Sequence, residues 1–402
     1  MATPSLKCHD TGSRLRGGLA GNQRGRTLMT ANRSVRSVEW SRRQALRLLG
    51  LGGAGLAAAC GSTREPEEPA ADSTPADSPG SPEPIVRTIL EDLTPDRLRG
   101  GAVLFHEHMS LDIAFWDRLV GADSPAREIF LGPPDSPYFM QDVDMMAAEM
   151  QAAAREGVSA VVDGGHADMG RDVAFLRAVS EQSGMPIVVS GGYYTDPFHP
   201  PELADQTEDE IAEGLAATAD AERWGAFGEI ASSEEMTPGE RKVFRAIGKA
   251  HLSTNIPIFT HTANGLEAET QLDIFESLGV PTGAVAIGHM GGLEDPEATV
   301  HRRLAERGAF VGFDRLGSGP EADGHKVPMV QSLIDAGYLE NILLASDFAT
   351  ARDTQRNGGP GYAKTVTQFV PMLREAGITE EDIRVMTVEN PLRLLAFVPR
   401  RG

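Results

Sequence analysis

The sequence predicts an α/β protein built as a (β/α)8 TIM barrel, preceded by a disordered N-terminal leader and linker. Eight short apolar runs lie between residues 102 and 349, and amphipathic segments separate them. The runs are continuous rather than alternating, which is typical of parallel strands covered on both faces. Eight such repeats favour a closed barrel over an open sheet. The chain of 402 residues, 41% of them hydrophobic, is long enough to bury the core of such a barrel.

Residues 1–60 are predicted to form an export signal. The stretch "SRRQALRLLGLGGAGLAAAC" sets Arg42 and Arg43 before an apolar run of about 13 residues, too short to span a bilayer. It resembles a twin-arginine signal. "LAAAC" resembles a lipobox with Cys60 as the lipidated residue, although its Leu stands one position early, at Leu56. We expect an exported protein anchored to the cell envelope through Cys60; the alternative is a basic leader with a chance cysteine.

Residues 61–84 are predicted to form a disordered linker, because Pro, acidic and small residues dominate them and cannot form a core. We expect the segment to be an extended tether between the anchor and the body. The hydrolytic body is expected at 85–402. The 40 residues before the arginine pair are long for a signal, so the chain starts at either Met1 or Met29.

The body alternates predicted strands with predicted helices. The strands are expected at 102–108, 159–165, 186–194, 225–230, 256–262, 284–292, 309–315 and 342–349. Amphipathic helices are expected at 171–184, 240–255, 298–308 and 329–341, and several of them end near a Gly, a common residue after a helix. In a barrel of this kind the active site lies at the carboxyl ends of the strands.

Metal-ligating side chains stand at the ends of five predicted strands. They are His106, His108, Glu229, His261, His289 and Asp347. Residues at i and i+2 of a strand point to the same side, so His106 and His108 can both face the barrel mouth with Glu107 turned away. Each residue alone has a plainer explanation, such as a helix cap for Asp347 or a surface carboxylate for Glu229. Together, four imidazoles and two carboxylates suit two divalent ions, with zinc favoured.

The charge of the body argues against a nucleic-acid partner. Residues 1–60 hold ten of the 37 Lys and Arg and two of the 58 Asp and Glu. The remaining 342 residues therefore carry 27 positive and 56 negative side chains. Binding to a phosphate backbone needs clustered Lys and Arg, so we expect no nucleic-acid partner.

The body resembles the phosphotriesterase-like branch of the amidohydrolase superfamily. The resemblance rests on "FHEHMSLD", "GEIASSEEMTPGERKVFRAIGKAHLSTNIPIFTHT", "IGHMGGLEDP", "VGFDRLG", "ILLASDF" and "TVENPLRLLAF", in the same order and spacing. It implies a barrel with a binuclear metal centre. By position, His106, His108 and Asp347 would hold the more buried ion and His261 and His289 the more exposed one. Glu229 would bridge them.

Two departures from the family pattern bear on the chemistry. Glu229 stands where many members have a carbamylated lysine, so the chain resembles a Glu-bridged variant. "GHMGG" replaces the commoner motif after the sixth strand, so paraoxon-type activity is not assumed. Lactonase members carry Tyr and Arg near the positions of Tyr193, Tyr194 and Arg315, so these are predicted substrate contacts. The alternatives are packing at the barrel rim for the tyrosines and an ion pair with a neighbour such as Asp314 for Arg315.

The predicted function is hydrolysis of a lactone or of a carboxylic or phosphoric ester by a metal-activated water, with Asp347 as general base. We expect three partners: a small-molecule substrate, a membrane only through the lipid anchor, and a second copy in a homodimer. Loops 316–328 and 350–365 are expected to select the substrate. The alternatives are a metal-dependent nuclease or phosphodiesterase on the same barrel, which the acidic body disfavours, and a non-catalytic metal-binding lipoprotein, which would have lost ligands.

Overall fold

The computed structural model describes residues 83–293 and 295–400. The predicted signal at 1–60, including Cys60, and all but the last two residues of the predicted linker at 61–84 lie outside these described residues. The export and lipidation of the chain therefore remain predictions. No helix in the described ranges has the length and apolar character needed to cross a membrane.

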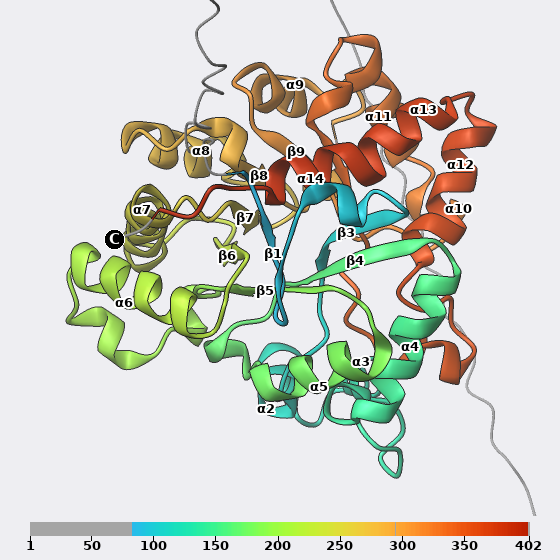
Figure 1. Cartoon of the computed structure of the whole chain (residues 1–402), viewed down its shortest axis with the longest axis horizontal. Coiled ribbons are helices and arrows are strands. Elements are labelled where there is room, and N and C mark those ends of the chain that lie inside the picture. Colours follow the sequence, from blue (N-terminus) through green and yellow to red (C-terminus); the bar gives the residue numbers. More distant parts are fainter. Residues whose placement is uncertain (1–82, 294, 401–402) are drawn as a thin grey trace, which may run out of the picture. The chain divides into compact units, whose positions relative to one another are not determined.

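Eight parallel strands form the predicted barrel, with helices around it (Figure 1). Each strand pairs with the next one along the chain, in order from the first to the last. The strands are β3 (Ala102–Glu107), β4 (Val158–Asp163), β5 (Ile187–Gly191), β6 (Ala226–Ala231), β7 (Ile258–His261), β8 (Val285–Ile287), β9 (Phe310–Phe313) and β10 (Ile342–Leu344).

The barrel closes where β3 meets the chain that follows β10. These two strands are not neighbours in the described strand order. Instead, the N–H of Asp347 donates to the carbonyl of His106 at 3.1 Å, and the N–H of His108 donates to the carbonyl of Phe348 at 3.0 Å. The first strand is thus joined to the loop after the last strand by a short stretch of backbone pairing, which we call the seam.

Glu107 reinforces the seam with its side chain. Its carboxylate is fully buried and accepts three hydrogen bonds. The donors are the N–H of Ser346 at 2.9 Å, the hydroxyl of Ser346 at 2.6 Å and the N–H of Phe348 at 2.7 Å. Glu107 therefore turns away from the mouth, as strand alternation predicts, and holds the two ends of the barrel together.

The helices cover the outside of the barrel. The longer ones are α4 (Val143–Arg155), α5 (Val173–Ser183), α6 (Glu208–Ala221), α7 (Pro238–Thr254), α8 (Ala268–Ser277), α9 (Thr299–Glu306) and α11 (Lys326–Asp335). Shorter ones are α2 (Ile113–Trp116), α3 (Arg127–Leu131), α10 (Pro320–Asp323), α12 (Val370–Glu375), α13 (Glu380–Arg384) and α14 (Asn390–Leu395). Both α6 and α7 begin with a capping box, in which Thr and Glu side chains satisfy the first free N–H groups.

The structure shortens several predicted elements. Strands expected at 284–292 and 342–349 end at Ile287 and Leu344, and the helix expected at 329–341 runs instead from Lys326 to Asp335. The apolar pattern continues past each strand because the loops that follow are themselves buried beneath the barrel mouth. The length of an apolar run therefore reflects how many residues are buried, and the strand itself ends earlier, where backbone pairing stops.

Two buried clusters correspond to the two faces of the sheet. Inside the barrel, large rings from alternate strands meet, and Phe105 lies edge-to-face on Phe259 with centroids 6.5 Å apart. Gly312 leaves room for this interior, because a Cβ at that position would lie 2.9 Å from Phe105. Outside, the intervening strand residues, such as Leu104 and Val161, pack against the helices. The interior is a filled core, as in other barrels of this type.

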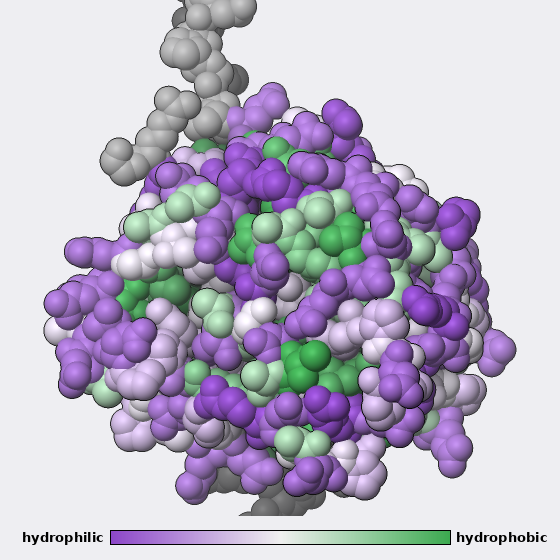
Figure 2. Space-filling model, turned by 90° about the horizontal axis from the view of Figure 1, so that it is seen from below, coloured by the Kyte–Doolittle hydropathy of each residue, from purple (hydrophilic) through white to green (hydrophobic). Residues whose placement is uncertain are grey.

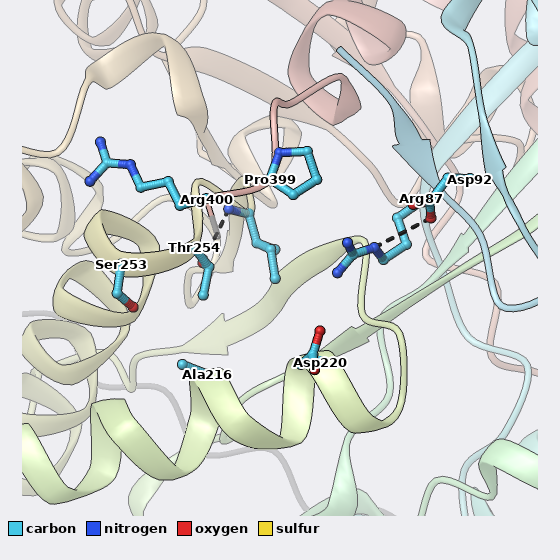
Figure 3. A pocket seen from close by; sticks show the side chains of 9 residues that line it. Arg87, Asp92, Ala216, Asp220, Ser253, Thr254, Pro399 and Arg400 are labelled. Carbon is cyan, nitrogen blue, oxygen red and sulfur yellow. Dashed lines mark hydrogen bonds and ion pairs between the residues drawn. The ribbon is translucent and has the colours of Figure 1, made fainter. Parts of the chain in front are cut away.

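A small hairpin closes the amino-terminal end of the barrel. It consists of β1 (Val86–Arg87) and β2 (Asp92–Leu93), and β1 crosses the middle of the ring in Figure 1. The C-terminal tail joins it through a bridge between Ile85 and Phe397. A cavity of about 580 Å³ opens beside them. Figure 3 shows its lining of Arg87, Asp92, Ala216, Asp220, Ser253, Thr254, Pro399 and Arg400.

Figure 2 shows small separate apolar areas within a largely hydrophilic face. In the described part of the chain, the large hydrophobic side chains that stand exposed are Leu90, Leu119, Ile129 and Leu266. Leu119 and Ile129 belong to the segment of α2 and α3, which follows the first barrel strand and extends over the mouth.

Candidate metal centre

The six predicted ligands converge at the carboxyl ends of the strands. His106, Glu229 and His261 lie within β3, β6 and β7, and His108 follows β3 directly. His289 and Asp347 stand two and three residues beyond their strands, in the left-handed region with φ of 59° and 49°. A left-handed residue turns the chain sharply, which directs these two side chains back over the mouth. Such strain in residues other than Gly is concentrated at functional sites.

One group of three ligand atoms comes from the two sides of the seam. The donor atoms of His106, His108 and Asp347 all lie within 4.8 Å of one another. His108 Nε2 is 3.0 Å from Asp347 Oδ1, and His106 Nε2 is 3.8 Å from the same oxygen. This is the set that the resemblance assigns to the more buried ion.

The second group centres on Glu229. Its carboxylate lies 2.9 Å from His106 Nε2, 3.2 Å from His261 Nδ1 and 3.4 Å from His289 Nε2. Ligand atoms of His106, Glu229 and His289 fall within 4.8 Å of one another. His261 Nδ1 adjoins this group, 2.9 Å from His289 Nε2. Glu229 thus contacts all four histidines, since His108 Nε2 is 3.4 Å away.

Asp314 completes the centre, and sequence reasoning missed it. Its two oxygens take one histidine each: His106 Nδ1 lies 2.7 Å from Oδ2, and His289 Nδ1 lies 2.7 Å from Oδ1. The backbone N–H of His289 also donates to Oδ1 at 2.6 Å. A carboxylate on the Nδ1 side fixes the tautomer that leaves Nε2 free to bind a metal. The only signal was its place in "GFDRLG" after a strand.

The alternative for Arg315 was an ion pair with a neighbour such as Asp314, and the structure pairs Arg315 with Asp347 instead. Arg315 Nε donates to Asp347 Oδ2 at 3.0 Å, and its Nη1 donates to Asn264 at 3.0 Å. Arg315 has a φ of 68°, and this turn separates it from the preceding aspartate. Asp347 is therefore held by His108 through one oxygen and by Arg315 through the other.

His166 lies just behind the centre. It is buried, its Nδ1 pairs with Asp168 at 2.5 Å, and its Nε2 lies 2.9 Å from the carbonyl of Glu229. Asp168 also accepts the N–H of Tyr194 at 2.8 Å. His166 thereby fixes the backbone of Glu229 and does not join the ligand atoms of either group.

The charges of the centre fit a bound cation. Burial opposes ionisation of Glu229 and Asp347, yet the neighbouring histidines hold the pKa of each carboxyl well below its ordinary value. The same holds for Asp314, whose pKa His289 and His106 lower against burial. His106 Nε2 and His108 Nδ1 are buried without a well-aligned hydrogen bond. The carboxylates of Glu229 and Asp347, together with these imidazole nitrogens, are the kind of donors that divalent ions require.

A cavity of about 280 Å³ opens over the centre. Its polar lining consists of His108, Glu229, His261, Arg315, Asp347 and Thr350, and its apolar lining of Leu111, Phe115, Trp116, Leu119, Phe130, Met169, Tyr194 and Ala349. Most of the apolar wall comes from residues 111–130, after the first barrel strand. This differs from the expectation that loops 316–328 and 350–365 select the substrate, because those loops contribute only Thr350.

The two tyrosines predicted to contact substrate lie in different surroundings. Tyr194 lines the cavity and lies edge-to-face on His261, with centroids 5.1 Å apart. Tyr193 does not line it and packs instead against His199, with centroids 6.1 Å apart. Arg315 reaches the cavity with its side chain 40% exposed. Of the three predicted substrate contacts, Tyr194 and Arg315 are therefore the ones placed beside the candidate centre.

Comparison with known proteins agrees with this geometry. Residues 86–395 match the model of the phosphotriesterase family. The phosphotriesterase homology protein of Escherichia coli is 31% identical over 72% of this chain and 96% of its own length. The N-acetyltaurine hydrolase of Mus musculus is 26% identical over 78% of this chain and 98% of its own.

A solved structure of the Escherichia coli protein, with phosphate in its active site, aligns with a TM-score of 0.65 and 28% identity. It covers 74% of this chain and 99% of that one. A lactonase from Listeria monocytogenes, 24% identical, shares the fold with a TM-score of 0.67, covering 78% of this chain and 99% of that one. Through the match along residues 86–395, the chain belongs to the phosphotriesterase family, whose members are metal-dependent hydrolases.

Proposed function

We propose that the protein is a binuclear metal hydrolase that opens a lactone or a carboxylic ester. The observation that carries the proposal is the convergence of six ligand side chains on the floor of a cavity whose wall is largely apolar. His106, His108 and Asp347 would hold one ion, and His261 and His289 the other, with Glu229 between them. When bound, such ions lower the pKa of a water and polarise a carbonyl oxygen.

Asp347 is suited to take a proton from the attacking water. Its carboxylate lines the cavity beside His108, and its lowered pKa keeps it ionised at neutral pH. Arg315 Nε fixes one of its oxygens at 3.0 Å, which keeps the carboxylate in one orientation. The Arg315 side chain also reaches into the cavity, where it can orient a substrate oxygen.

The apolar wall favours an uncharged substrate with a hydrophobic group. Trp116 stacks on Phe130 with ring centroids 4.2 Å apart, and the Trp116 N–H donates to the hydroxyl of Tyr138 at 2.7 Å. These contacts hold the rings in place before a substrate arrives, so less side-chain entropy is lost on binding. The acidic surface of the body likewise disfavours polyanionic substrates such as nucleic acids.

A phosphoester is the second candidate. It is favoured by the Escherichia coli structure, which holds phosphate in its active site. The similar N-acetyltaurine hydrolase is named for a substrate with an amide bond, so amides belong among the substrate classes to be tested. The assay is therefore a panel of lactones, carboxylic esters, phosphoesters and N-acyl amino acids, matched in the size of their apolar group.

The test combines metal analysis with that panel. The purified protein is expected to carry about two divalent ions, with zinc favoured, and to hydrolyse lactones or carboxylic esters fastest. His108→Ala and Glu229→Ala should lose metal and activity together. His251→Asn is the control, because His251 is a buried histidine at the opposite end of the barrel that bonds the carbonyl of Ile256 at 2.7 Å. Wild-type protein without metal and without activity on the panel would refute the proposal.

The cellular location is a separate proposal that rests on the leader sequence. Arg42 and Arg43 would direct export, and a lipid on Cys60 would hold the hydrolase at the outer face of a membrane. Labelling with a fatty acid should mark the wild type and not Cys60→Ala, which should be released in soluble form. Equal labelling of both proteins would contradict the anchor.

A further inference from the structure

Arg315 is held from its backbone as well as from its side chain. The residue has a φ of 68°, so its carbonyl does not continue the strand pairing of β9. That carbonyl accepts a hydrogen bond from Lys326 Nζ at 2.7 Å. Lys326 lies in the first turn of α11 and is only 7% exposed. A buried ammonium group thus reaches across to the main chain of the one arginine in the cavity lining.

Lys326 is paired with a second buried charge, Asp323. The two side chains meet at 2.6 Å, and Asp323 is fully buried at the end of α10. The other oxygen of Asp323 accepts the N–H groups of Ser318 and Gly319, at 2.7 and 3.1 Å. The pair therefore ties the first turn of α11 to the loop that begins at Arg315.

Lys326 also contacts the loop that carries a predicted metal ligand. Its aliphatic stem packs on Gly291, where an added Cβ would lie 3.3 Å from Lys326 Cδ. Gly291 is two residues beyond His289. One lysine thus spans the loops after β8 and β9, and both loops reach the candidate centre.

A buried ion pair adds little net stability compared with apolar residues of similar volume, because its desolvation cost offsets its attraction. The polar side-chain atoms of Asp323 and Lys326 instead bond each other and backbone groups between Arg315 and Gly319. Such an arrangement fixes the shape of a loop.

We propose that the buried Asp323–Lys326 pair is a positioning device that sets Arg315 toward both the substrate and Asp347. Neither residue touches the cavity, so both act through Arg315. The part of this inference that concerns substrate rests on the proposed function. The part that concerns the bond between Arg315 and Asp347 does not.

The test variant is Asp323→Asn with Lys326→Met. It removes both charges, and the Asn oxygen can still accept from Ser318 and Gly319. The matched control is Asp353→Asn with Lys364→Met. In that pair Lys364 is buried and Asp353 is half-buried, the side chains are 3.1 Å apart, and neither residue bonds Arg315.

The first measurement needs neither metal nor substrate. The Arg315 Nε–H resonance of the ¹⁵N-arginine-labelled protein is assigned by its disappearance in Arg315→Lys. Because this N–H is bonded to Asp347, we expect it to exchange slowly in the wild type and in the control pair. In the test variant it should shift and exchange at least about tenfold faster, since the donor no longer holds its alignment.

The second measurement uses the hydrolysed ester. The test variant should raise KM by about tenfold or more at unchanged metal content, as expected when a substrate-orienting group is displaced. In an Arg315→Ala background the same two substitutions should add nothing, because the effect passes through Arg315. If the double variant does not fold, Lys326→Arg keeps the charge opposite Asp323 but presents a bulkier planar head to the carbonyl, and the same shifts are expected.

The outcomes separate the two proposals. A wild type with no metal and no activity overturns the proposed function, and the Nε–H exchange still decides whether the pair positions Arg315. An unchanged Nε–H signal and unchanged KM in the test variant overturn the positioning role while leaving the hydrolase intact. Equal effects in the control pair would show only general loosening and would also overturn it.

Discussion

Replacing Glu107 should weaken the barrel at its seam and release metal, although Glu107 is not a ligand. Glu107→Ala removes three hydrogen bonds and leaves the buried N–H groups of Ser346 and Phe348 without their acceptor. A net bond is worth about 1 kcal/mol, and an orphaned buried donor costs about 1–3 kcal/mol. Burial raises the pKa of Glu107 to about 7, so its removal also relieves a desolvation cost.

The expected net loss is about 3 kcal/mol for Glu107→Ala, a large part of the total stability of about 5–15 kcal/mol of a typical domain. Glu107→Gln should lose about 1–2 kcal/mol, because its amide must face one of the two backbone N–H groups. The assay is urea unfolding of metal-free protein followed by tryptophan fluorescence, with bound metal counted separately. Metal content should fall in both variants, since the seam aligns His106 and His108 with Asp347.

Glu149→Gln is the control, because Glu149 is a buried carboxylate with one weak backbone contact at 3.3 Å and no link to the seam. It should change the free energy of unfolding by less than about 1 kcal/mol. A Glu107→Ala protein within about 0.5 kcal/mol of the wild type and with full metal content would refute the reasoning.

Three further predictions follow from the same structure. Burial lowers the pKa of His301, so the folded state favours the neutral imidazole. The stability that this group contributes is complete above about pH 6.5 and is lost as the pH falls below it. His301→Gln should therefore flatten the pH dependence of the free energy of unfolding, measured from pH 7 to 5. Asp314→Ala should weaken metal binding about 10–100-fold in chelator competition, because two histidines lose their orienting carboxylate. Trp116→Ala should raise KM for aryl esters about tenfold while changing methyl esters little, and equal changes for both would exclude the wall as a contact.

The strands and their order were predictable because parallel strands buried on both faces leave an unmistakable apolar run. The same logic located His106 and His108, whose shared direction follows from alternation along one strand. His289 and Asp347 were found by their place after a run. Both side chains reach the centre because their backbone adopts the left-handed conformation, and no residue pattern predicts this conformation.

Other parts of the site depend on contacts between distant segments. Asp314 and Arg315 are adjacent in the sequence, yet Asp314 bonds two histidines and Arg315 bonds Asp347. Only the turn between them decides this assignment. The wall at 111–130 also escaped prediction. Its helices α2 and α3 span four and five residues and are too short to show a period.

The seam has a consequence for when the centre can exist during synthesis. Glu107 and Ser346 are separated by 239 residues, and the two sides of the seam each supply ligands. Until the chain beyond Phe348 has left the ribosome, His106 and His108 have no Asp347 to face, and the edge of β3 at the seam is unpaired. The group of His106, His108 and Asp347 can therefore form only in a chain that extends to the seam, and a truncation before Asp347 removes this group along with the closure.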